Sequence, residues 1–423
     1  MNGPISWFSS TRRLIRILWT VRRFGLDELV VSGAASSSRS PWLLRMTRWL
    51  RMGTIREPRG VRLRMAFESL GPIFVKFGQV LSTRRDLLPP DIANELALLQ
   101  DRVPPFPADQ AVAEIERGLV MRLEQAFAEF GREPIASASI AQVHRARLHD
   151  GTQVAVKVLR PGMLDVIEDD LSLLRTGATL AMRLSADARR LRPMEVVDEF
   201  DHYLHDELDL VREAANANQL KRNFEGSTLL RIPQMYWDYC RRNVLVMEWV
   251  NGIPIGQTER MRAVGIDLEK LSRDGVEIFF TQVFRDGFFH ADPHPGNIFI
   301  RDDGRISLID FGLVGHLSAP RRHEILSLIK ALAERDPFTM QYVLGNWAQG
   351  ELPDENLLGA DVLEMLLNYE NTPVSDLRIS QVINDITQIM RGHGLTLPAD
   401  LVMLFKTLIT LEGVVKRLDG STE

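Results

Sequence analysis

Apolar residues recur along this chain with two different spacings, and these spacings predict its elements. From about residue 119 to 159 they alternate, which is typical of half-buried antiparallel strands. Residues 163–223 have helical spacing, and because the stretch 194–224 contains neither Pro nor Gly we predict one long helix there. A strand at 243–250 precedes a mostly helical remainder. The pattern predicts an α+β fold with a small antiparallel sheet and a helical body.

The first 65 residues differ from the rest in charge. They contain 13 Arg, no Lys and 3 acidic residues, a formal net charge of +10, whereas the whole chain carries −5. Aromatic residues alternate with arginines here, as in helices that lie on an anionic membrane surface: Trp7, Phe8, Trp19, Arg12, Arg13, Arg16, Arg22 and Arg23. A helix that docks on the acidic body is the alternative interpretation, with a transit peptide as a minor one.

Composition places the chain among globular proteins, with 45% hydrophobic and 25% charged residues. The sequence contains no run of about 18 apolar residues, the minimum for a membrane-spanning helix, and the N-terminal stretch lacks the uninterrupted core of a secretory signal. The single cysteine, Cys240, excludes an intramolecular disulfide and fits a reducing compartment. We therefore expect a cytosol-facing protein.

A loop of small residues lies within the predicted sheet. Residues 136–143 have the spacing of the phosphate-binding loop G-x-G-x-x-G-x-V of protein kinases, with alanine at all three glycine positions. Alanine lets the backbone approach phosphates but loses access to positive φ, so this loop should be stiffer than a glycine loop. Taken alone, the segment indicates only a small-residue turn. With the motifs that follow, we assign phosphate binding to Ala136, Ser137, Ala138, Ser139, Ala141 and Val143.

Lys157 is the next candidate. It ends the segment 154–157, Val-Ala-Val-Lys, the form of the kinase V-A-I-K strand whose lysine neutralises the α- and β-phosphates. Strand alternation places Lys157 on the face opposite the neighbouring valines. Such a lysine needs an acidic partner on the following helix; Glu213 is the first choice, with Glu207 and Asp209 as alternatives.

The segment 289–297 carries the most specific signal. Its Asp292 and Asn297 reproduce the spacing of the catalytic loop H-R-D-x-x-x-x-N, which makes Asp292 the base or acceptor-orienting carboxylate and Asn297 a Mg²⁺ ligand. A short hairpin later, Asp310 begins Asp-Phe-Gly and would bridge Mg²⁺ to the phosphates. His294 more often orients the backbone of such a loop than binds a transition metal, so the implied metal is Mg²⁺.

These segments together predict a protein-kinase-like bilobal fold that binds ATP and Mg²⁺, with Glu248 and Val250 completing the nucleotide site. Ala291 replaces the arginine that in protein kinases usually binds the phosphorylated activation loop. The segment after Asp310 is short, because Ala319-Pro320 follows only nine residues later. So short a segment offers little surface for a peptide. We expect a small-molecule or lipid acceptor, or ATP hydrolysis itself, rather than protein phosphorylation.

The chain resembles the UbiB/ADCK atypical kinases over nearly its whole length. The resemblance is carried by the Ala-rich loop, by residues 76–79 (Lys-Phe-Gly-Gln), by 207–209 (Glu-Leu-Asp) and by 290–297, while 70–87 and 280–290 resemble the bacterial UbiB branch. It implies an ATPase or kinase-like activity that supports ubiquinone biosynthesis at the inner membrane. Quinone-precursor lipids and other ubiquinone biosynthesis proteins are the implied partners, with no nucleic acid.

The resemblance also implies regulation by Lys76 and Gln79, on a helical segment packed over the active site. Lys76 could pair there with Glu207 or Asp209 and restrict substrate access, although sequence alone indicates only a surface lysine. UbiB proteins end in an apolar transmembrane pair that this sequence lacks. We therefore expect peripheral attachment to anionic lipid on the cytoplasmic face of a bacterial inner membrane.

Four regions follow from these assignments. They are a basic N-terminal segment (1–60), a helical extension with the Lys-x-Gly-Gln motif (61–110), a kinase-like N-lobe (111–250) and a helical C-lobe (251–423). Two other functions stay open: a soluble small-molecule phosphotransferase of the aminoglycoside or choline kinase type, and a scaffold switched by nucleotide binding. The segment 76–79 and the Ala-rich loop argue against the phosphotransferase.

Overall fold

The computed structural model of the chain divides it into two compact units. The first comprises residues 1–105, 137–140 and 160–206, and the second comprises 106–136, 141–159 and 207–423. No described helix is long and apolar enough to cross a membrane. Most of the basic N-terminal segment lies outside the described residues, which are 19–20, 23–25, 57–100, 103–184, 192–348, 354–370, 372 and 377–419.

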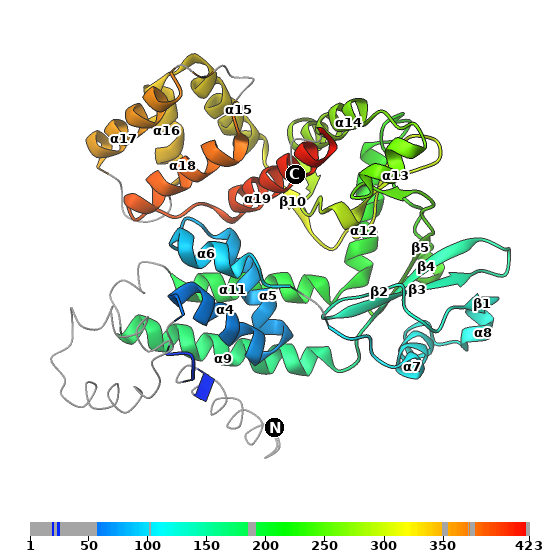
Figure 1. Cartoon of the computed structure of the whole chain (residues 1–423). Coiled ribbons are helices and arrows are strands. Elements are labelled where there is room, and N and C mark those ends of the chain that lie inside the picture. Colours follow the sequence, from blue (N-terminus) through cyan, green and yellow to red (C-terminus); the bar gives the residue numbers. More distant parts are fainter. Residues whose placement is uncertain are drawn as a thin grey trace. The chain divides into compact units, whose positions relative to one another are not determined.

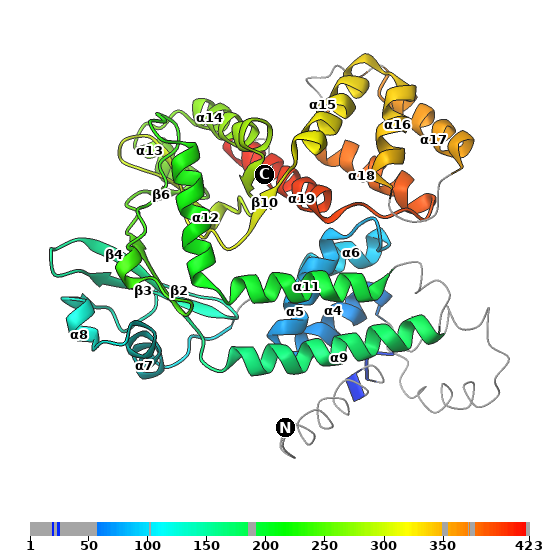
Figure 2. The ribbon, with the colours of Figure 1, turned by 180° about the vertical axis from the view of Figure 1, so that it is seen from behind.

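Helices build the first unit: α4 (Arg59–Leu70), α5 (Pro72–Thr83), α6 (Pro90–Leu96), α9 (Met163–Leu184) and α11 (Pro193–Glu207). Gly71 separates α4 from α5 with φ +120°, a conformation that side chains rarely allow, and Pro72 then opens α5. Figures 1 and 2 show α9 and α11 running side by side with α4 and α5 against them. The rings of Phe77 and Phe200, 5.1 Å apart, join α5 to α11.

The long helix predicted at 194–224 is wrong, because the chain breaks between α11 and α12 (Leu210–Asn223). Asp209 caps α12: its carboxylate accepts from the backbone N–H groups of Val211 and Arg212 at 3.1 and 3.4 Å. The segment around Asp209 contains neither Pro nor Gly, the residues that usually mark the end of a helix in a sequence. The break was therefore invisible to a search for helix breakers.

The second unit begins with a five-stranded antiparallel sheet. Its order is β1-β3-β4-β5, with β2 also paired to β3. The two short helices beside it are α7 (Ala108–Leu119) and α8 (Leu123–Ala126). The strands are β1 (Glu129–Phe130), β2 (Ala136–Ser137), β3 (Ala141–Arg147), β4 (Gln153–Leu159) and β5 (Val244–Glu248).

The two faces of this sheet have different partners. Val154, Val156 and Val158 pack with Ile115 and Leu119 of α7 in one buried cluster; Figure 1 shows α7 beside these strands. Because side chains alternate along a strand, Lys157 points to the other face. The sheet thus separates an apolar core from the face that carries the lysine.

The rest of the second unit is mostly helical, as predicted. Among its described residues it contains five short strands, which are β6 (Ile253–Pro254), β7 (Phe288–His290), β8 (Ile298–Ile300), β9 (Ile306–Leu308) and β10 (Val314–His316). They form two small sheets, β6-β8-β9 and β7-β10, and the catalytic-loop and Asp-Phe-Gly segments lie in or next to these strands. The helices are α13 (Thr258–Ala263), α14 (Leu268–Phe280), α15 (Ala319–Glu334), α16 (Pro337–Trp347), α17 (Glu355–Asn368), α18 (Ile379–Gly392) and α19 (Ala399–Asp419).

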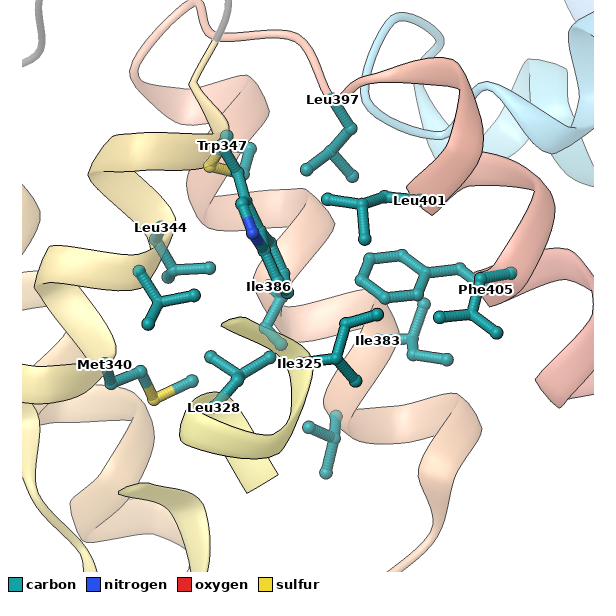
Figure 3. Close-up of a cluster of buried hydrophobic side chains, with 14 of the residues drawn as sticks. Ile325, Leu328, Met340, Leu344, Trp347, Ile383, Ile386, Leu397, Leu401 and Phe405 are labelled. Atoms are coloured by element: carbon teal, nitrogen blue, oxygen red, sulfur yellow. The ribbon is translucent and has the colours of Figure 1, made fainter. Parts of the chain in front are cut away.

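One large apolar cluster holds helices α14 to α19 together. Trp347 lies at its centre, fully buried, with its Nε1 donating to Glu324 at 2.8 Å and its ring 6.1 Å from that of Phe405 (Figure 3). Leu344 and Ile386 close around the indole from α16 and α18. The cluster also contains Phe289 and Ala291, so the catalytic-loop segment is anchored in the same core.

Candidate active site

Lys157 and Glu213 form a buried ion pair. Lys157 Nζ lies 2.9 Å from both carboxylate oxygens of Glu213, and the two side chains are only 17% and 5% exposed. Val143 and Leu245 are the strand partners of Lys157. Glu213 stands in the first turn of α12, so the Asp209 cap that starts this helix also sets the position of the acidic partner.

Asp310 joins this pair from a strained backbone position. Its Oδ1 lies 3.5 Å from Lys157 Nζ and accepts from Gly312 N–H at 3.2 Å, while Phe311 N–H donates to Glu213 at 3.2 Å. Its φ of +64° is unusual for a residue with a side chain, and such conformations are held by their surroundings. Asp310 is half exposed, so its carboxylate is open to a ligand.

Lys157, Glu213 and Asp310 shift one another's pKa values. Burial opposes the charged form of Lys157, but Asp310 and Glu213 outweigh it and raise the pKa of the amine. The charge of Lys157 lowers the pKa of Asp310. Both groups are therefore ionised at neutral pH. Burial raises the pKa of the Glu213 carboxyl, and the charge of Lys157 opposes this shift.

The catalytic-loop segment is held by His290, which is 2% exposed. Its Nε2 lies 2.6 Å from the carbonyl of Asp310, so Nε2 carries the proton and donates. Nδ1 is then the acceptor for the N–H of Asp292 at 3.3 Å. His290 thus links Asp292 to Asp310. His294, which is exposed, accepts from Gly296 N–H at 3.0 Å and stabilises its own turn.

Asn297 is oriented by Asp292. Its Nδ2 donates to the carbonyl and to Oδ2 of Asp292, both at 3.2 Å. That leaves Oδ1 of Asn297 as the atom able to coordinate a metal. An amide oxygen together with the Asp310 carboxylate suits Mg²⁺, which keeps several waters and binds through few protein ligands plus phosphate. No cluster of three or more His, Cys, Asp or Glu that could hold a metal occurs among the described residues.

The Ala-rich loop divides between the two units. Ala136, Ala141 and Val143 belong to the second unit, and residues 137–140 to the first. Within the first unit, Ser137 Oγ donates to the carbonyl of Val103 at 3.2 Å, and Arg160 Nε donates to that of Ser139 at 3.2 Å. Ala136 and Ala138 are exposed, whereas Ser139 and Ala141 are buried. A phosphate contact by this loop stays a prediction.

The carboxylate of Glu248 is already occupied. It accepts from Arg301 at 3.0 Å, from Arg231 at 3.2 Å and from the backbone N–H of Gln234 at 3.1 Å. A nucleotide contact by Glu248 would therefore involve its backbone. Val250 lies two residues beyond the end of β5 and is half-buried.

The four residues predicted to regulate the site fall in different units. Lys76 is 8% exposed and lies 5.6 Å from the ring centroid of Tyr203, and Gln79 donates to the carbonyl of Leu99 at 3.1 Å, all within the first unit. Glu207 and Asp209 belong to the second unit. Asp209 caps α12, and Glu207 adds to the raised pKa of Lys157. Pairing of Lys76 with either residue stays a prediction.

Sequence reasoning missed three residues that position the site. Gln282 Oε1 accepts from His290 N–H at 2.8 Å, Asn216 donates to the carbonyl of Phe311 at 3.0 Å, and Thr407 donates to that of Ala291 at 3.1 Å. Only Gln282 had any signal, since it lies in the segment that resembles UbiB. The other two act over long separations in sequence and match no motif.

The small antiparallel sheet, the Lys157–Glu213 pair and the helical body define a kinase-like fold. Comparison with known families agrees: residues 98–344 match the ABC1 atypical kinase-like domain, and residues 362–423 match the UbiB helical domain. The chain therefore belongs to the ABC1/UbiB family of atypical kinase-like proteins, which confirms the predicted family and fold class. Among solved structures it is similar to Rv3197 of Mycobacterium tuberculosis in complex with erythromycin, with 24% identity, a TM-score of 0.49, and coverage of 81% of this chain and 87% of that chain.

Proposed function

We propose that the protein binds ATP with Mg²⁺ and cleaves the terminal phosphate, transferring it to a small-molecule or lipid acceptor or to water. The observation that carries this proposal is the junction of Lys157, Glu213 and Asp310, with Nζ at 2.9 and 3.5 Å from the two acidic partners. Such a lysine neutralises phosphate charge, and such an aspartate holds Mg²⁺. A purely structural ion pair would not need a third, half-exposed carboxylate.

The residues of the site suit a nucleotide and Mg²⁺. Asp310 and Oδ1 of Asn297 would hold Mg²⁺, which would neutralise charge that develops on the phosphate oxygens. Glu213 keeps the Lys157 amine oriented and charged. Asp292 has one carboxylate oxygen bonded to Asn297, so the other can accept a proton from the attacking hydroxyl or water. His290 forms hydrogen bonds with the backbone of both Asp292 and Asp310 and so holds these two residues at a fixed distance.

We further propose that this activity supports ubiquinone biosynthesis from the cytoplasmic face of a bacterial inner membrane, with the protein bound peripherally. The match to the UbiB helical domain and the basic, aromatic-rich sequence of residues 1–23 support this part. Quinone-precursor phenols bearing an isoprenoid chain are the proposed substrate class.

One experiment tests both parts. Mg²⁺-dependent ATP hydrolysis is measured for the full chain alone, with anionic vesicles, and with quinone-precursor phenols. We expect turnover that requires Mg²⁺ and rises with each addition. Tight Mg²⁺-ATP binding without turnover under all conditions would contradict the enzyme and favour the nucleotide-switched scaffold. Turnover that changes with neither vesicles nor phenols would contradict the proposed role at the membrane in ubiquinone biosynthesis, but not the proposed ATP cleavage.

A further inference from the structure

The backbone around Phe311 is held by side chains. Phe311 follows Asp310 in the connection between β9 and β10. In the peptide group that joins the two residues, the carbonyl accepts from His290 Nε2 at 2.6 Å and the N–H donates to Glu213 at 3.2 Å. In the next peptide group, the carbonyl accepts from Asn216 Nδ2 at 3.0 Å and the N–H donates to Asp310 Oδ1 at 3.2 Å. Side chains thus satisfy every polar group of these two peptides.

Asn216 belongs to no motif of the proposed site, whereas the other side chains in this arrangement do. It lies one turn after Glu213 in α12, so both residues project from the same face of the helix. From this face Glu213 accepts from the N–H of Phe311, and Asn216 donates to its carbonyl. The helix that carries the partner of Lys157 therefore also holds both backbone polar groups of Phe311.

Asp310 depends on these hydrogen bonds because its backbone is strained. Its φ of +64° persists only where the surrounding structure determines it. The Phe311 ring is fully buried and packs edge-on against the His290 ring, with the centroids 5.8 Å apart. Apolar packing anchors this ring but has no direction, whereas hydrogen bonds orient the peptide groups. Loss of the Asn216 bond would therefore favour a relaxed backbone, in which the Asp310 carboxylate changes position.

We propose that Asn216 is a positioning residue that sets the Mg²⁺ affinity of the nucleotide site. Through the backbone of Phe311 it holds the conformation in which the Asp310 carboxylate is half exposed and lies 3.5 Å from Lys157 Nζ. The inference rests on the proposed function, in which Asp310 holds Mg²⁺. An asparagine with a structural role alone would change the stability of the protein and leave its Mg²⁺ requirement unchanged.

Calorimetric titration of the full chain with ATP at several free Mg²⁺ concentrations tests this role. Asn216→Leu keeps the size of the side chain and removes the donor. We expect the Mg²⁺ concentration that gives half the maximal ATP affinity to rise about fivefold, the factor that one hydrogen bond contributes to an equilibrium. Asn216→Gln restores an amide donor and should recover part of the loss. Gln219→Leu is the matched control and should behave like the parent, because Gln219 Nε2 donates within α12, to Asn223 at 2.8 Å.

Amide hydrogen exchange of residues 306–312 in the nucleotide-free protein is a second readout, and it should be about fivefold faster in Asn216→Leu than in the parent. Asn216→Ala also removes the donor, and alanine favours the helix, so this variant serves if Asn216→Leu does not fold. A parental Mg²⁺ dependence or a parental exchange rate in both variants would overturn the role of Asn216 alone. A parent whose ATP binding does not depend on Mg²⁺ would instead contradict the proposed function, and this inference with it.

Discussion

Thr407 in α19 donates its hydroxyl to the backbone carbonyl of Ala291, 3.1 Å away, across 116 residues of sequence. Thr407 lies in the segment that matches the UbiB helical domain, and Ala291 lies next to Asp292 in the kinase-like domain. The side chain is fully buried, and the same hydroxyl lies 2.7 Å from the carbonyl of Met403. This hydrogen bond connects the helical domain to the catalytic loop, in addition to the apolar cluster that contains Ala291.

Thr407→Val should lower the turnover number for ATP hydrolysis about fivefold and leave the KM for ATP nearly unchanged. Valine keeps the shape but removes the donor, a loss of about 1 kcal/mol, and Asp292 positions the attacking group rather than the nucleotide. Thr407→Ser should recover most of the rate. Steady-state kinetics of the three proteins provide the measurement; an equal loss in the serine variant would point to packing instead.

Asp310→Asn should lower Mg²⁺-dependent turnover about 100-fold or more and should leave the fold intact. The substitution removes the charge that the metal needs and also one of the two partners of Lys157, while keeping the size of the side chain. Asp303→Asn is a matched control, because Asp303 lies in the nearby β8–β9 hairpin and pairs with the partly exposed Arg231 and Arg305. Unchanged Mg²⁺-ATP affinity and turnover in Asp310→Asn would contradict the metal assignment.

Local pattern predicts Lys157, Asp292, Asn297 and Asp310 as site residues, because each lies in a short segment whose spacing is dictated by strand or loop geometry. Their roles stay predictions, and the structure shows that Lys157 and Asp310 lie 3.5 Å apart. The first choice of Glu213 as the partner of Lys157 also agrees with the structure. The helix break at Asp209 was missed, since an N-cap depends on a side-chain bond that composition does not reveal.

Long-range contacts account for the other differences. The nucleotide contact predicted for Glu248 stays a prediction, and Arg231 and Arg301 reach its carboxylate from other segments. Gln282 and Thr407 act on the catalytic loop through bonds to its backbone, which leave no periodicity in the sequence. Tertiary structure decides such contacts, and no window of neighbouring residues contains them.

Removing residues 1–30 should abolish binding to anionic vesicles, if the basic N-terminal segment is the membrane contact. Each arginine near such a surface contributes on the order of 1 kcal/mol, an effect that fades within about one Debye length, so binding by the full chain should fall steeply as salt rises. Co-flotation with cardiolipin-containing vesicles provides the measurement. The control replaces the five arginines at 12, 13, 16, 22 and 23 with lysine, which keeps the charge and should keep the binding. Equal flotation of the full and shortened chains would reject the segment.

A buried network of hydrogen-bonded side chains in the sheet predicts how the free energy of unfolding depends on pH. His144 is fully buried, and its Nδ1 donates to the carbonyl of Gly131 at 2.8 Å, which leaves Nε2 to accept from Gln142 at 2.9 Å. Gln142 Oε1 in turn accepts from the N–H of Phe106 at 3.1 Å. A second proton on His144 would place two N–H donors face to face. The network therefore requires a neutral imidazole.

Burial lowers the pKa of His144 below its ordinary value of 6.5, so between the two pKa values the unfolded chain binds the extra proton and the folded chain does not. Stability should accordingly be complete above about pH 6.5 and should decline as the pH falls below it. His144→Gln should flatten this decline, measured as the difference in melting temperature between pH 7.5 and pH 5.5. Some slope should remain, because burial also lowers the pKa of His316. The control is His149→Gln, at an exposed histidine two positions beyond β3, which should keep the parent slope. An undiminished slope in His144→Gln would show that this histidine does not titrate on unfolding as its burial requires.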